Sequence, residues 1–243
     1  TDKGVVVMNT PGGNSVSAAE HVFALLLSLV RKIPAAQISL KSGNWDPKQF
    51  VGQELQNKTL GIIGLGKIGV IVAQLAHSFH MKVLVFDPFV SKKYVADLGV
   101  ELVDLKKLLS QCDFVSLHLP LNDKTIGMIC KKTLNLMKKN SFLVNTSRGA
   151  LVVEEDLAVA LEKGNLAGAA LDVFEKEPEV NPGLRFSDRT VLTPHIAGST
   201  VEAQTKVGYE IAVQVANYLR HEIIANAVNF PSLDKRELEH MQP

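Results

Sequence analysis

Short apolar runs alternate with helical patterns through the middle of the chain. The runs that predict strands cover residues 59–65, 82–87, 100–103, 113–119, 141–146, 167–174 and 190–193. The helical patterns between them cover residues 68–79, 92–98, 105–111, 131–139 and 154–163. Strands that are apolar throughout and connected by helices are typical of a parallel sheet buried on both faces. Because such crossovers are right-handed, we predict an α/β fold with a doubly wound open sheet.

Two longer helical patterns flank this alternation. Ser17 and Glu20 have the spacing of a capping box, so a helix is predicted to begin at Ser17. Its continuation over residues 22–30 is apolar almost all round, which predicts burial on every side, including against a partner subunit. The second pattern covers residues 201–220, and an extended segment at 226–230 and a charged tail at 234–240 follow it. Near the start, residues 5–7 are all valine and resemble a strand.

Composition excludes several classes of protein. The chain is 46% hydrophobic and 21% charged, as in globular proteins rather than disordered ones. A formal net charge of +1 argues against nucleic acid or an acidic membrane as a partner. The most apolar run, residues 22–30, is too short to cross a bilayer, and no signal peptide is evident. Cys112 and Cys130 predict reduced thiols, a cytoplasmic location and no metal site.

A glycine-rich turn joins the strand at 59–65 to the helix that follows it. Gly64, Gly66 and Gly69 form the pattern G-x-G-x-x-G in the strand–turn–helix context that a dinucleotide requires. The first glycine permits the tight turn, the second lets backbone amides approach a pyrophosphate, and the third lets the helix pack on the strand. These amides lie at the positive end of the helix dipole, so the turn predicts a binding site for two phosphates.

Asp87 ends the next predicted strand, at the spacing expected for a carboxylate that binds the ribose hydroxyls of a dinucleotide. A 2′-phosphate at this place would meet a like charge, which favours NAD over NADP. Lys92 and Lys93 follow within a few residues and reduce this preference.

Three later strands end in groups suited to chemistry on a 2-keto or 2-hydroxy acid. The segments are residues 144–149 (VNTSRG), 171–178 (LDVFEKEP) and 193–198 (TPHIAG). Arg148 can bind a carboxylate through two hydrogen bonds, and His195 can exchange a proton near neutral pH. A carboxylate beside His195 would orient its ring and stabilise the protonated form. The remaining candidates, His77, His80 and His118, are interpreted as structural or surface groups.

These motifs resemble those of the D-isomer-specific 2-hydroxyacid dehydrogenases. The resemblance covers nearly the whole chain, from residues 8–11 (MNTP) and 14–20 (NSVSAAE) to 226–231 (NAVNFP). It implies a catalytic triad of Arg148, Glu177 and His195. Glu175 is the rival of Glu177, and only the Glu-Pro ending of the family motif selects Glu177. No metal is implied.

The resemblance also implies the cofactor contacts and the reaction. Together with the glycine turn, the expected NAD contacts are Gly64, Gly66, Lys67, Ile68, Gly69, Asp87, Leu119, Thr146, Ser147, Arg148, Asp172, His195, Ile196, Ala197 and Gly198. The implied activity is NAD-dependent oxidation of 3-phosphoglycerate to 3-phosphohydroxypyruvate, the first step of serine biosynthesis. Two alternatives remain open: a glyoxylate or hydroxypyruvate reductase, and an NAD-binding scaffold similar to a co-repressor.

Domain organisation is the one departure from the family pattern. Members begin with a substrate domain of about a hundred residues, a usual domain size, and that portion is absent here. We therefore expect residues 1–8 to end a missing N-terminal segment, residues 9–201 to form the dinucleotide-binding domain, and residues 202–243 to return to the substrate domain. The expected fold is a Rossmann-type domain with a remnant of the substrate domain, in a homodimer or homotetramer.

Overall fold

The computed structural model describes residues 4–230. The described chain divides into two compact units: Ala18–Ala197 forms one, and residues 4–17 with 198–230 form the other. The elements, in chain order, are α1 (Ser15–Val30), α2 (Ile33–Lys41), η1 (Pro47–Phe50), β1 (Thr59–Ile63), α3 (Lys67–Ser78), β2 (Lys82–Phe86), α4 (Lys92–Asp97), β3 (Glu101–Leu102), α5 (Leu105–Gln111), β4 (Phe114–Leu117), α6 (Lys131–Leu134), β5 (Phe142–Asn145), η2 (Gly149–Leu151), α7 (Glu154–Glu162), β6 (Gly168–Leu171), α8 (Pro182–Arg185), β7 (Thr190–Leu192) and α9 (Val201–His221).

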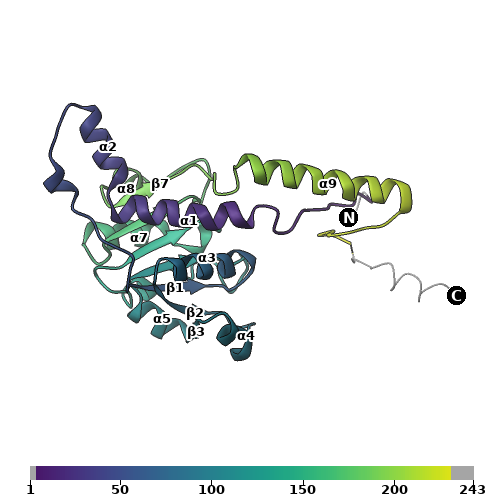
Figure 1. Cartoon of the computed structure of the whole chain (residues 1–243), viewed down its shortest axis with the longest axis horizontal. Coiled ribbons are helices and arrows are strands. Elements are labelled where there is room, and N and C mark those ends of the chain that lie inside the picture. Colours follow the sequence, from purple (N-terminus) through teal and green to yellow (C-terminus); the bar gives the residue numbers. More distant parts are fainter. Residues whose placement is uncertain (1–3, 231–243) are drawn as a thin grey trace. The chain divides into compact units, whose positions relative to one another are not determined.

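The Ala18–Ala197 unit is built on a parallel sheet of seven strands in the order β3-β2-β1-β4-β5-β6-β7 (Figure 1). The order runs one way from β1 to β3 and the other way from β4 to β7. This reversal is the signature of a doubly wound sheet, and the predicted α/β fold is confirmed. Each of the seven predicted strands is present, and each is shorter than predicted by one to three residues at one or both ends.

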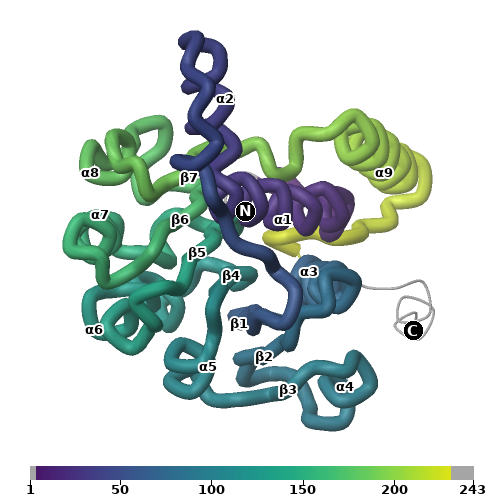
Figure 2. The backbone as a smooth tube through the Cα atoms, turned by 60° about the vertical axis from the view of Figure 1, so that its left-hand side comes forward, coloured from purple at the N-terminus to yellow at the C-terminus, as the bar shows by residue number. Residues whose placement is uncertain are grey.

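Helices cover both faces of the sheet, as Figure 2 shows. Along β1, Leu60 and Ile62 join the core cluster beneath α1 and α3, whereas Ile63 joins the cluster beneath α5, α6 and α7. The same alternation divides β2, where Val83 and Leu84 belong to opposite clusters. Successive side chains of a strand point to opposite faces, so a strand buried on both faces must be apolar throughout. The continuous apolar runs in the sequence follow from this arrangement.

The reversal of strand order has a consequence for binding. The connections that follow β1 and β4 lead to opposite faces of the sheet, so a doubly wound sheet is expected to bind a ligand at the carboxyl ends of these two neighbouring strands. Ligands of open α/β sheets bind in the crevice at such a reversal.

The predicted start of the first helix was wrong. α1 begins at Ser15, directly after a turn in which the Ser15 amide donates to the Gly12 carbonyl at 3.2 Å. Ser17 therefore lies inside the first helical turn, where its hydroxyl donates to the carbonyl of Asn14 at 2.9 Å instead of capping an amide. The valines at 5–7 form no strand either.

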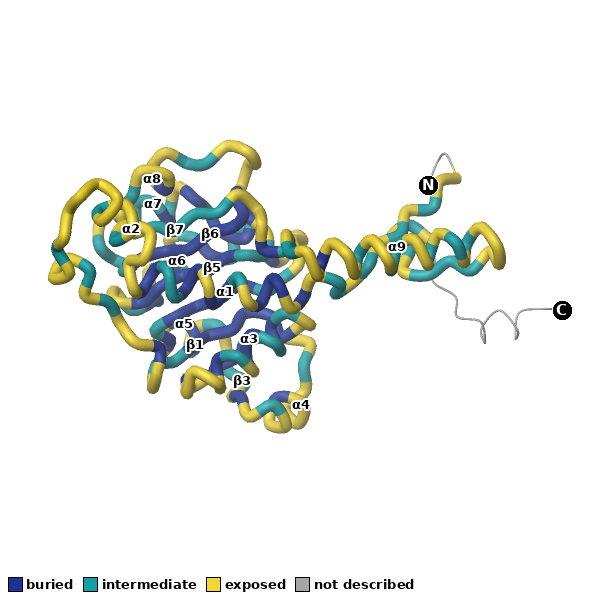
Figure 3. Tube along the Cα trace, turned by 45° about the horizontal axis from the view of Figure 1, so that its top comes forward, coloured by how far each residue is buried: buried dark blue, intermediate teal, exposed yellow. Residues whose placement is uncertain are grey.

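α2 and η1 were not predicted from the sequence. Pro34 stands in the first turn of α2, a place that tolerates proline because the amide there has no helical partner. No residue of α2 is buried, and Figure 3 shows this segment largely exposed. Within residues 4–230 no single helix is long and apolar enough to cross a membrane, although α1 and α2, bent by 60°, pass that test as a pair.

The other unit contains α9 and pairs the two ends of the described chain. Met8 forms an antiparallel bridge with Ala227, and the Asn229 side chain bonds the backbone of Val5 and Val7. α9 begins at a cap in which the Thr200 hydroxyl accepts from the Ala203 amide at 3.1 Å. The predicted helix at 201–220 is confirmed, and the predicted tail at 234–240 lies outside the described residues.

Candidate active site and dinucleotide crevice

Each glycine of the turn after β1 is required for a different reason. Gly64 has a φ of +96°, and a Cβ there would lie 2.5 Å from the carbonyl oxygen of His118. A Cβ on Gly69 would overlap the carbonyl oxygen of Gly64, so this glycine lets α3 pack against the turn. A Cβ on Gly66 would meet no atom within 4 Å. The open space over Gly66, at the start of α3, is the space that a pyrophosphate needs to approach the backbone amides.

Asp87 braces this turn. One carboxylate oxygen accepts from the Leu65 amide and the other from the Phe89 amide, each at 2.8 Å. Each oxygen retains a further lone pair for a ligand hydroxyl. Asp87 thus ties the end of β2 to the glycine turn of β1, and the carboxylate is held in place before any ligand arrives.

His118 and Leu119 directly follow the end of β4. The Nε2 atom of His118 lies 2.9 Å from the hydroxyl of buried Ser116, and its Nδ1 atom has no hydrogen-bond partner. Burial lowers the pKa of His118 to about 4, so the ring is neutral near pH 7. A neutral, inward-facing ring agrees with its interpretation as a structural group.

The turn after β5 is shaped by Asn145, a buried residue whose side chain closes it on both sides. Its Nδ2 donates to the Arg148 carbonyl at 2.8 Å, and its Oδ1 accepts from the Ser147 amide at 3.0 Å. The Ser147 hydroxyl donates to the Leu117 carbonyl at 2.5 Å, which joins this turn to the end of β4. The guanidinium of Arg148 donates to the Ser147 carbonyl at 2.6 Å and is exposed beyond the strand ends.

His195 and Glu177 form a hydrogen-bonded pair beyond the ends of β6 and β7. The distance from Nδ1 of His195 to Oε2 of Glu177 is 2.8 Å. A carboxylate only accepts, so Nδ1 carries a proton and Nε2 is left for another partner. The other oxygen of Glu177 accepts from the Phe174 amide at 3.2 Å. The hydrogen bond from His195 lowers the pKa of Glu177, which keeps this carboxylate ionised beside the imidazole.

Glu175, the rival carboxylate, makes no contact with His195. Its amide donates to the Glu154 carboxylate at 2.6 Å, which fixes the backbone between Phe174 and Lys176. The structure thus brings Glu177, and not Glu175, to the histidine.

Asp172 is fully buried at the end of β6, beneath the turn that carries His195. Its carboxylate accepts from the amides of Ile196 and Ala197 at 2.9 and 2.8 Å. Burial raises the pKa of Asp172, but hydrogen bonds from His21, Thr193 and these amides outweigh burial and lower it overall. With these internal donors around it, Asp172 holds the turn and presents no exposed oxygen to a ligand.

The residues predicted for the site lie just after the carboxyl ends of the strands. Lys67 and Ile68 begin α3, Leu119 follows β4, and Thr146 follows β5. Gly198 is the exception, because it belongs to the other compact unit. Three residues with positioning contacts were missed: His21, Asn145 and Thr193. Asn145 directly precedes the Thr-Ser-Arg motif, so its place at a strand end was the signal available in the sequence.

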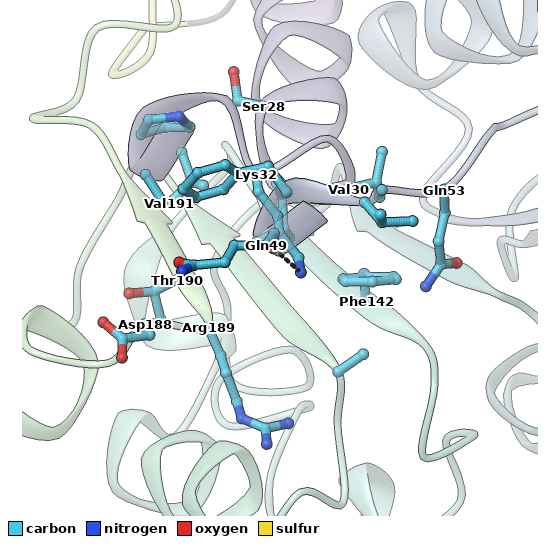
Figure 4. Close-up of a pocket in the computed structure, with 17 residues that line it drawn as sticks. Ser28, Val30, Lys32, Gln49, Gln53, Phe142, Asp188, Arg189, Thr190 and Val191 are labelled. Atoms are coloured by element: carbon cyan, nitrogen blue, oxygen red, sulfur yellow. Dashed lines mark hydrogen bonds between the residues drawn. The ribbon is translucent and has the colours of Figure 1, made fainter. Parts of the chain in front are cut away.

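A hollow of about 670 Å³ lies at the amino ends of the strands, opposite the predicted site. It is lined by Phe142 at the amino end of β5, by Thr190 at that of β7, and by Lys32, whose Nζ donates to the Gln49 carbonyl at 3.2 Å (Figure 4). The amino ends of the strands are remote from the glycine turn, so the hollow is not the candidate dinucleotide site. Among residues 4–230, no three His, Cys, Asp or Glu side chains form a group that could hold a metal ion.

Comparison with known proteins identifies the family. Residues 23–197 match the model of the D-isomer specific 2-hydroxyacid dehydrogenase, NAD binding domain. The chain is 46% identical to the D-3-phosphoglycerate dehydrogenase of Archaeoglobus fulgidus and 42% identical to that of Homo sapiens. Each alignment covers all of this chain and 46% of the relative, so the chain spans about half the length of these relatives.

Solved structures agree with this match. A glyoxylate reductase from Paecilomyes thermophila is 33% identical with a TM-score of 0.87, over 94% of this chain and 69% of that one. A D-lactate dehydrogenase from Aquifex aeolicus, complexed with NAD and lactic acid, is 32% identical with a TM-score of 0.85, over 95% of this chain and 75% of that one. The chain therefore belongs to the D-isomer specific 2-hydroxyacid dehydrogenase family and carries the NAD-binding domain of that family.

Proposed function

We propose that the chain is the NAD-binding part of an enzyme that oxidises 3-phosphoglycerate to 3-phosphohydroxypyruvate, the entry to serine biosynthesis. The observation that carries a dehydrogenase activity is the 2.8 Å pair of His195 and Glu177 beyond the strand ends. The choice of substrate is supported by relatives named D-3-phosphoglycerate dehydrogenase, which are 42–46% identical over the whole chain.

The proposed dinucleotide site follows from the geometry of the glycine turn. The amides at the start of α3 bind the pyrophosphate over Gly66, and Asp87 accepts from the ribose hydroxyls. A 2′-phosphate would meet the negative charge of Asp87, so NAD is preferred over NADP. The further contacts proposed are with Gly64, Lys67, Ile68, Gly69, Leu119, Thr146, Ser147, Arg148, His195, Ile196, Ala197 and Gly198. Asp172, also expected as a contact from the sequence, is not included, because it is fully buried and its carboxylate accepts from internal donors.

Three side chains carry the proposed chemistry. Arg148 binds the carboxylate and the C2 oxygen of the substrate through its guanidinium. Nε2 of His195 takes the proton of the C2 hydroxyl, and Glu177 stabilises the resulting imidazolium through Nδ1. A bound NAD would supply the acceptor for the hydride of C2. In the reverse direction His195 returns the proton to the C2 oxygen.

An assay of the complete protein tests the substrate. Oxidation of 3-phosphoglycerate and reduction of phosphohydroxypyruvate, glyoxylate and hydroxypyruvate would be compared by kcat/KM. The proposal expects the phosphorylated substrates to be preferred. A preference for glyoxylate or hydroxypyruvate would assign a reductase instead. Negligible rates on all four, together with tight NAD binding, would assign a scaffold similar to a co-repressor.

Gly66→Ala is expected to weaken NAD binding by about tenfold or more without lowering stability. The added methyl group meets no atom within 4 Å, so the fold accommodates it, but the methyl occupies the space proposed for the pyrophosphate. Calorimetric titration of NAD and a thermal melt measure the two effects. Gly208→Ala in α9, whose Cβ also meets no atom within 4 Å, is the control. An unchanged affinity in Gly66→Ala would contradict the proposed pyrophosphate position.

We also propose a homo-oligomer, but with a different contact surface from the one expected from the sequence. Val22, Leu25 and Leu26 of α1 are buried inside the Ala18–Ala197 unit and are not free for a partner. The α2–η1 segment, residues 33–51, instead exposes large apolar side chains, among them Ile38 at 68% and Trp45 at 83%. Exposed apolar patches of this kind mark interaction sites, and a second copy of the chain is the occupant proposed here.

Trp45→Ser is expected to shift the chain toward the monomer. Loss of an aromatic anchor commonly costs an interface about 2 kcal/mol or more, which raises the dissociation constant by about thirtyfold. Sedimentation velocity over a concentration series measures the change. Phe186→Ser, at a side chain that is 78% exposed, is the matched control. A wild-type chain that stays monomeric at high concentration, or a Trp45→Ser variant that associates like the wild type, would refute this surface.

The domain boundaries and the cellular location are also proposed, the first from the compact units and the second from the cysteines. The unit Ala18–Ala197 contains every strand of the sheet and supports the central part of the proposed dinucleotide-binding domain, residues 9–201, whereas residues 9–17 and 198–201 fall in the other unit. Residues 1–8 are proposed to end an N-terminal segment, and residues 202–243 to return to the substrate domain. Cys112 and Cys130 are both free thiols, which supports a cytoplasmic location.

A further inference from the structure

The backbone of His195 is held in an unusual conformation. Its φ is +55°, in the left-handed region that non-glycine residues rarely adopt. Three hydrogen bonds to Asp172 maintain it: the His195 amide donates to the Asp172 carbonyl at 2.8 Å, and the amides of Ile196 and Ala197 donate to its carboxylate. The orientation of the imidazole toward Glu177 therefore depends on the position of the Asp172 carboxylate.

That carboxylate is buried without a lysine or arginine beside it in the described part of the chain. Its side-chain partners are Thr193 and His21. The Thr193 hydroxyl donates to Oδ1 of Asp172 at 2.5 Å, and Nε2 of His21 lies 3.4 Å from the same oxygen. A buried carboxylate needs such donors, because an unsatisfied buried charge is strongly unfavourable.

The direction of the hydrogen bonds can be deduced from the single proton of the Thr193 hydroxyl. Because that proton goes to the carboxylate, the hydroxyl oxygen accepts from Nε2 of His21, 3.0 Å away. Nε2 of His21 therefore carries a proton. A continuous relay of donors runs from His21 on α1, through Thr193 after β7, to Asp172 after β6 and then to the turn of His195.

We propose that His21 is a positioning residue for His195. It contacts neither the proposed substrate nor the proposed cofactor, and it acts through Thr193 and Asp172 on the turn at 195–197. Ala18, Val22 and Leu25 on the same helix are buried apolar residues. The donor at this place fixes the hydroxyl and the carboxylate beneath the turn. The kinetic consequence rests on the proposed function, whereas the effect on the turn does not.

The first experiment measures the turn itself in the full chain, without substrate or cofactor. His21→Leu removes the donor at similar volume, and His21→Gln retains an amide donor. Amide hydrogen exchange at Ile196 and Ala197 is expected to rise by about tenfold or more in His21→Leu and to return toward the wild-type rate in His21→Gln. Equal exchange in His21→Leu and the wild type, or equal exchange in the two variants, would overturn the proposal.

A second variant guards against a folding defect in α1. Thr193→Val breaks the same relay from the strand side, leaves α1 unchanged, and is expected to raise exchange at the same two amides. Unchanged exchange at these amides in Thr193→Val would also overturn the relay. Exchange in β1, on the far side of the crevice, serves as the internal control and is expected to stay at the wild-type rate.

The kinetic arm uses the complete protein. A displaced His195 lowers kcat for 3-phosphoglycerate by about ten- to a hundredfold in His21→Leu, with a smaller change in KM, and His21→Gln recovers part of the loss. Altered exchange with no turnover in the wild type would retain the relay and refute the proposed function. If the wild type is active but exchange at Ile196 and Ala197 is unaltered in the variants, the proposed function would be retained and the relay refuted.

Discussion

Replacing His195 with alanine is expected to lower the turnover of 3-phosphoglycerate in the complete protein by about 10²- to 10⁴-fold, the usual contribution of a general acid–base group. The reason lies in the pair with Glu177. Nδ1 of His195 is committed to the carboxylate at 2.8 Å, so Nε2 is the atom that takes the substrate proton. Steady-state kinetics with NAD in excess measures the loss.

NAD affinity is the necessary companion measurement. The glycine turn and Asp87 do not depend on the imidazole, so the dissociation constant of NAD in His195→Ala should stay within about threefold of the wild type, a difference of about 0.7 kcal/mol. His77→Ala, at an exposed histidine in the last turn of α3, is the matched control and should retain full turnover. Wild-type turnover in His195→Ala would remove His195 from the mechanism.

Glu177→Gln separates orientation from charge in the same pair. The amide oxygen of glutamine can still accept from Nδ1 of His195, which preserves the contact with the ring. The negative charge that stabilises the imidazolium is lost, and the NH2 group, which only donates, replaces the oxygen that accepts from the Phe174 amide. We expect Glu177→Gln to lower turnover clearly, but by less than His195→Ala does. Steady-state kinetics of the two variants measures the difference.

Much of the sheet was predictable because its strands are buried on both faces. β1 and β2 appear in the sequence as continuous apolar runs, and their positions depend on little else. The ends of strands were less predictable. The apolar run of β1 continues through Leu65, yet the strand ends at Ile63, because Gly64 at a φ of +96° turns the chain out of the sheet. Such an end depends on backbone conformation rather than on hydrophobicity.

α2 could not be predicted for the opposite reason. Residues 33–41 contain apolar side chains, but none of them is buried in this chain, so their spacing follows no core. A periodic pattern arises only where one face of a helix packs against something. If a second copy covers residues 33–51, the pattern belongs to an interface that a single sequence does not reveal.

The side chains that carry the proposed chemistry could be predicted from the sequence, but the residues that hold them in place could not. Arg148 and His195 stand at strand ends and have the side chains that a hydroxy acid requires. The residues that hold them are distant in the sequence: His21 lies 172 residues before Thr193, which it contacts. A single histidine on an apolar helix carries no signal of its partner, and only the folded sheet brings α1 beside the ends of β6 and β7. The catalytic roles themselves stay predictions until the variants are measured.

Gly149→Ala is expected to destabilise the fold by about 3 kcal/mol, at the upper end of the range for overpacked sites. Gly149 is buried directly after Arg148, and a Cβ there would overlap the carbonyl carbon and oxygen of Phe174 and lie 2.5 Å from the Glu175 amide. These atoms belong to the backbone, so no side-chain rotation can relieve the overlap. For a chain of this size the melting temperature should fall by about 6–12 °C, which calorimetry or circular dichroism measures.

The displaced backbone connects this variant to catalysis. The Phe174 amide donates to Oε1 of Glu177, whose other oxygen holds His195, so a shift of Phe174 moves the pair while Arg148 moves with the altered turn. Turnover of the folded fraction should therefore fall as well, even below the melting transition. Gly208→Ala, which meets no atom within 4 Å and lies inside α9, should leave turnover unchanged and should not lower the melting temperature. A Gly149→Ala variant that melts within about 1 °C of the wild type would mean that the contact between this turn and Phe174 is looser than the structure has it, and that the positions of Arg148 and Glu177 are not coupled through it.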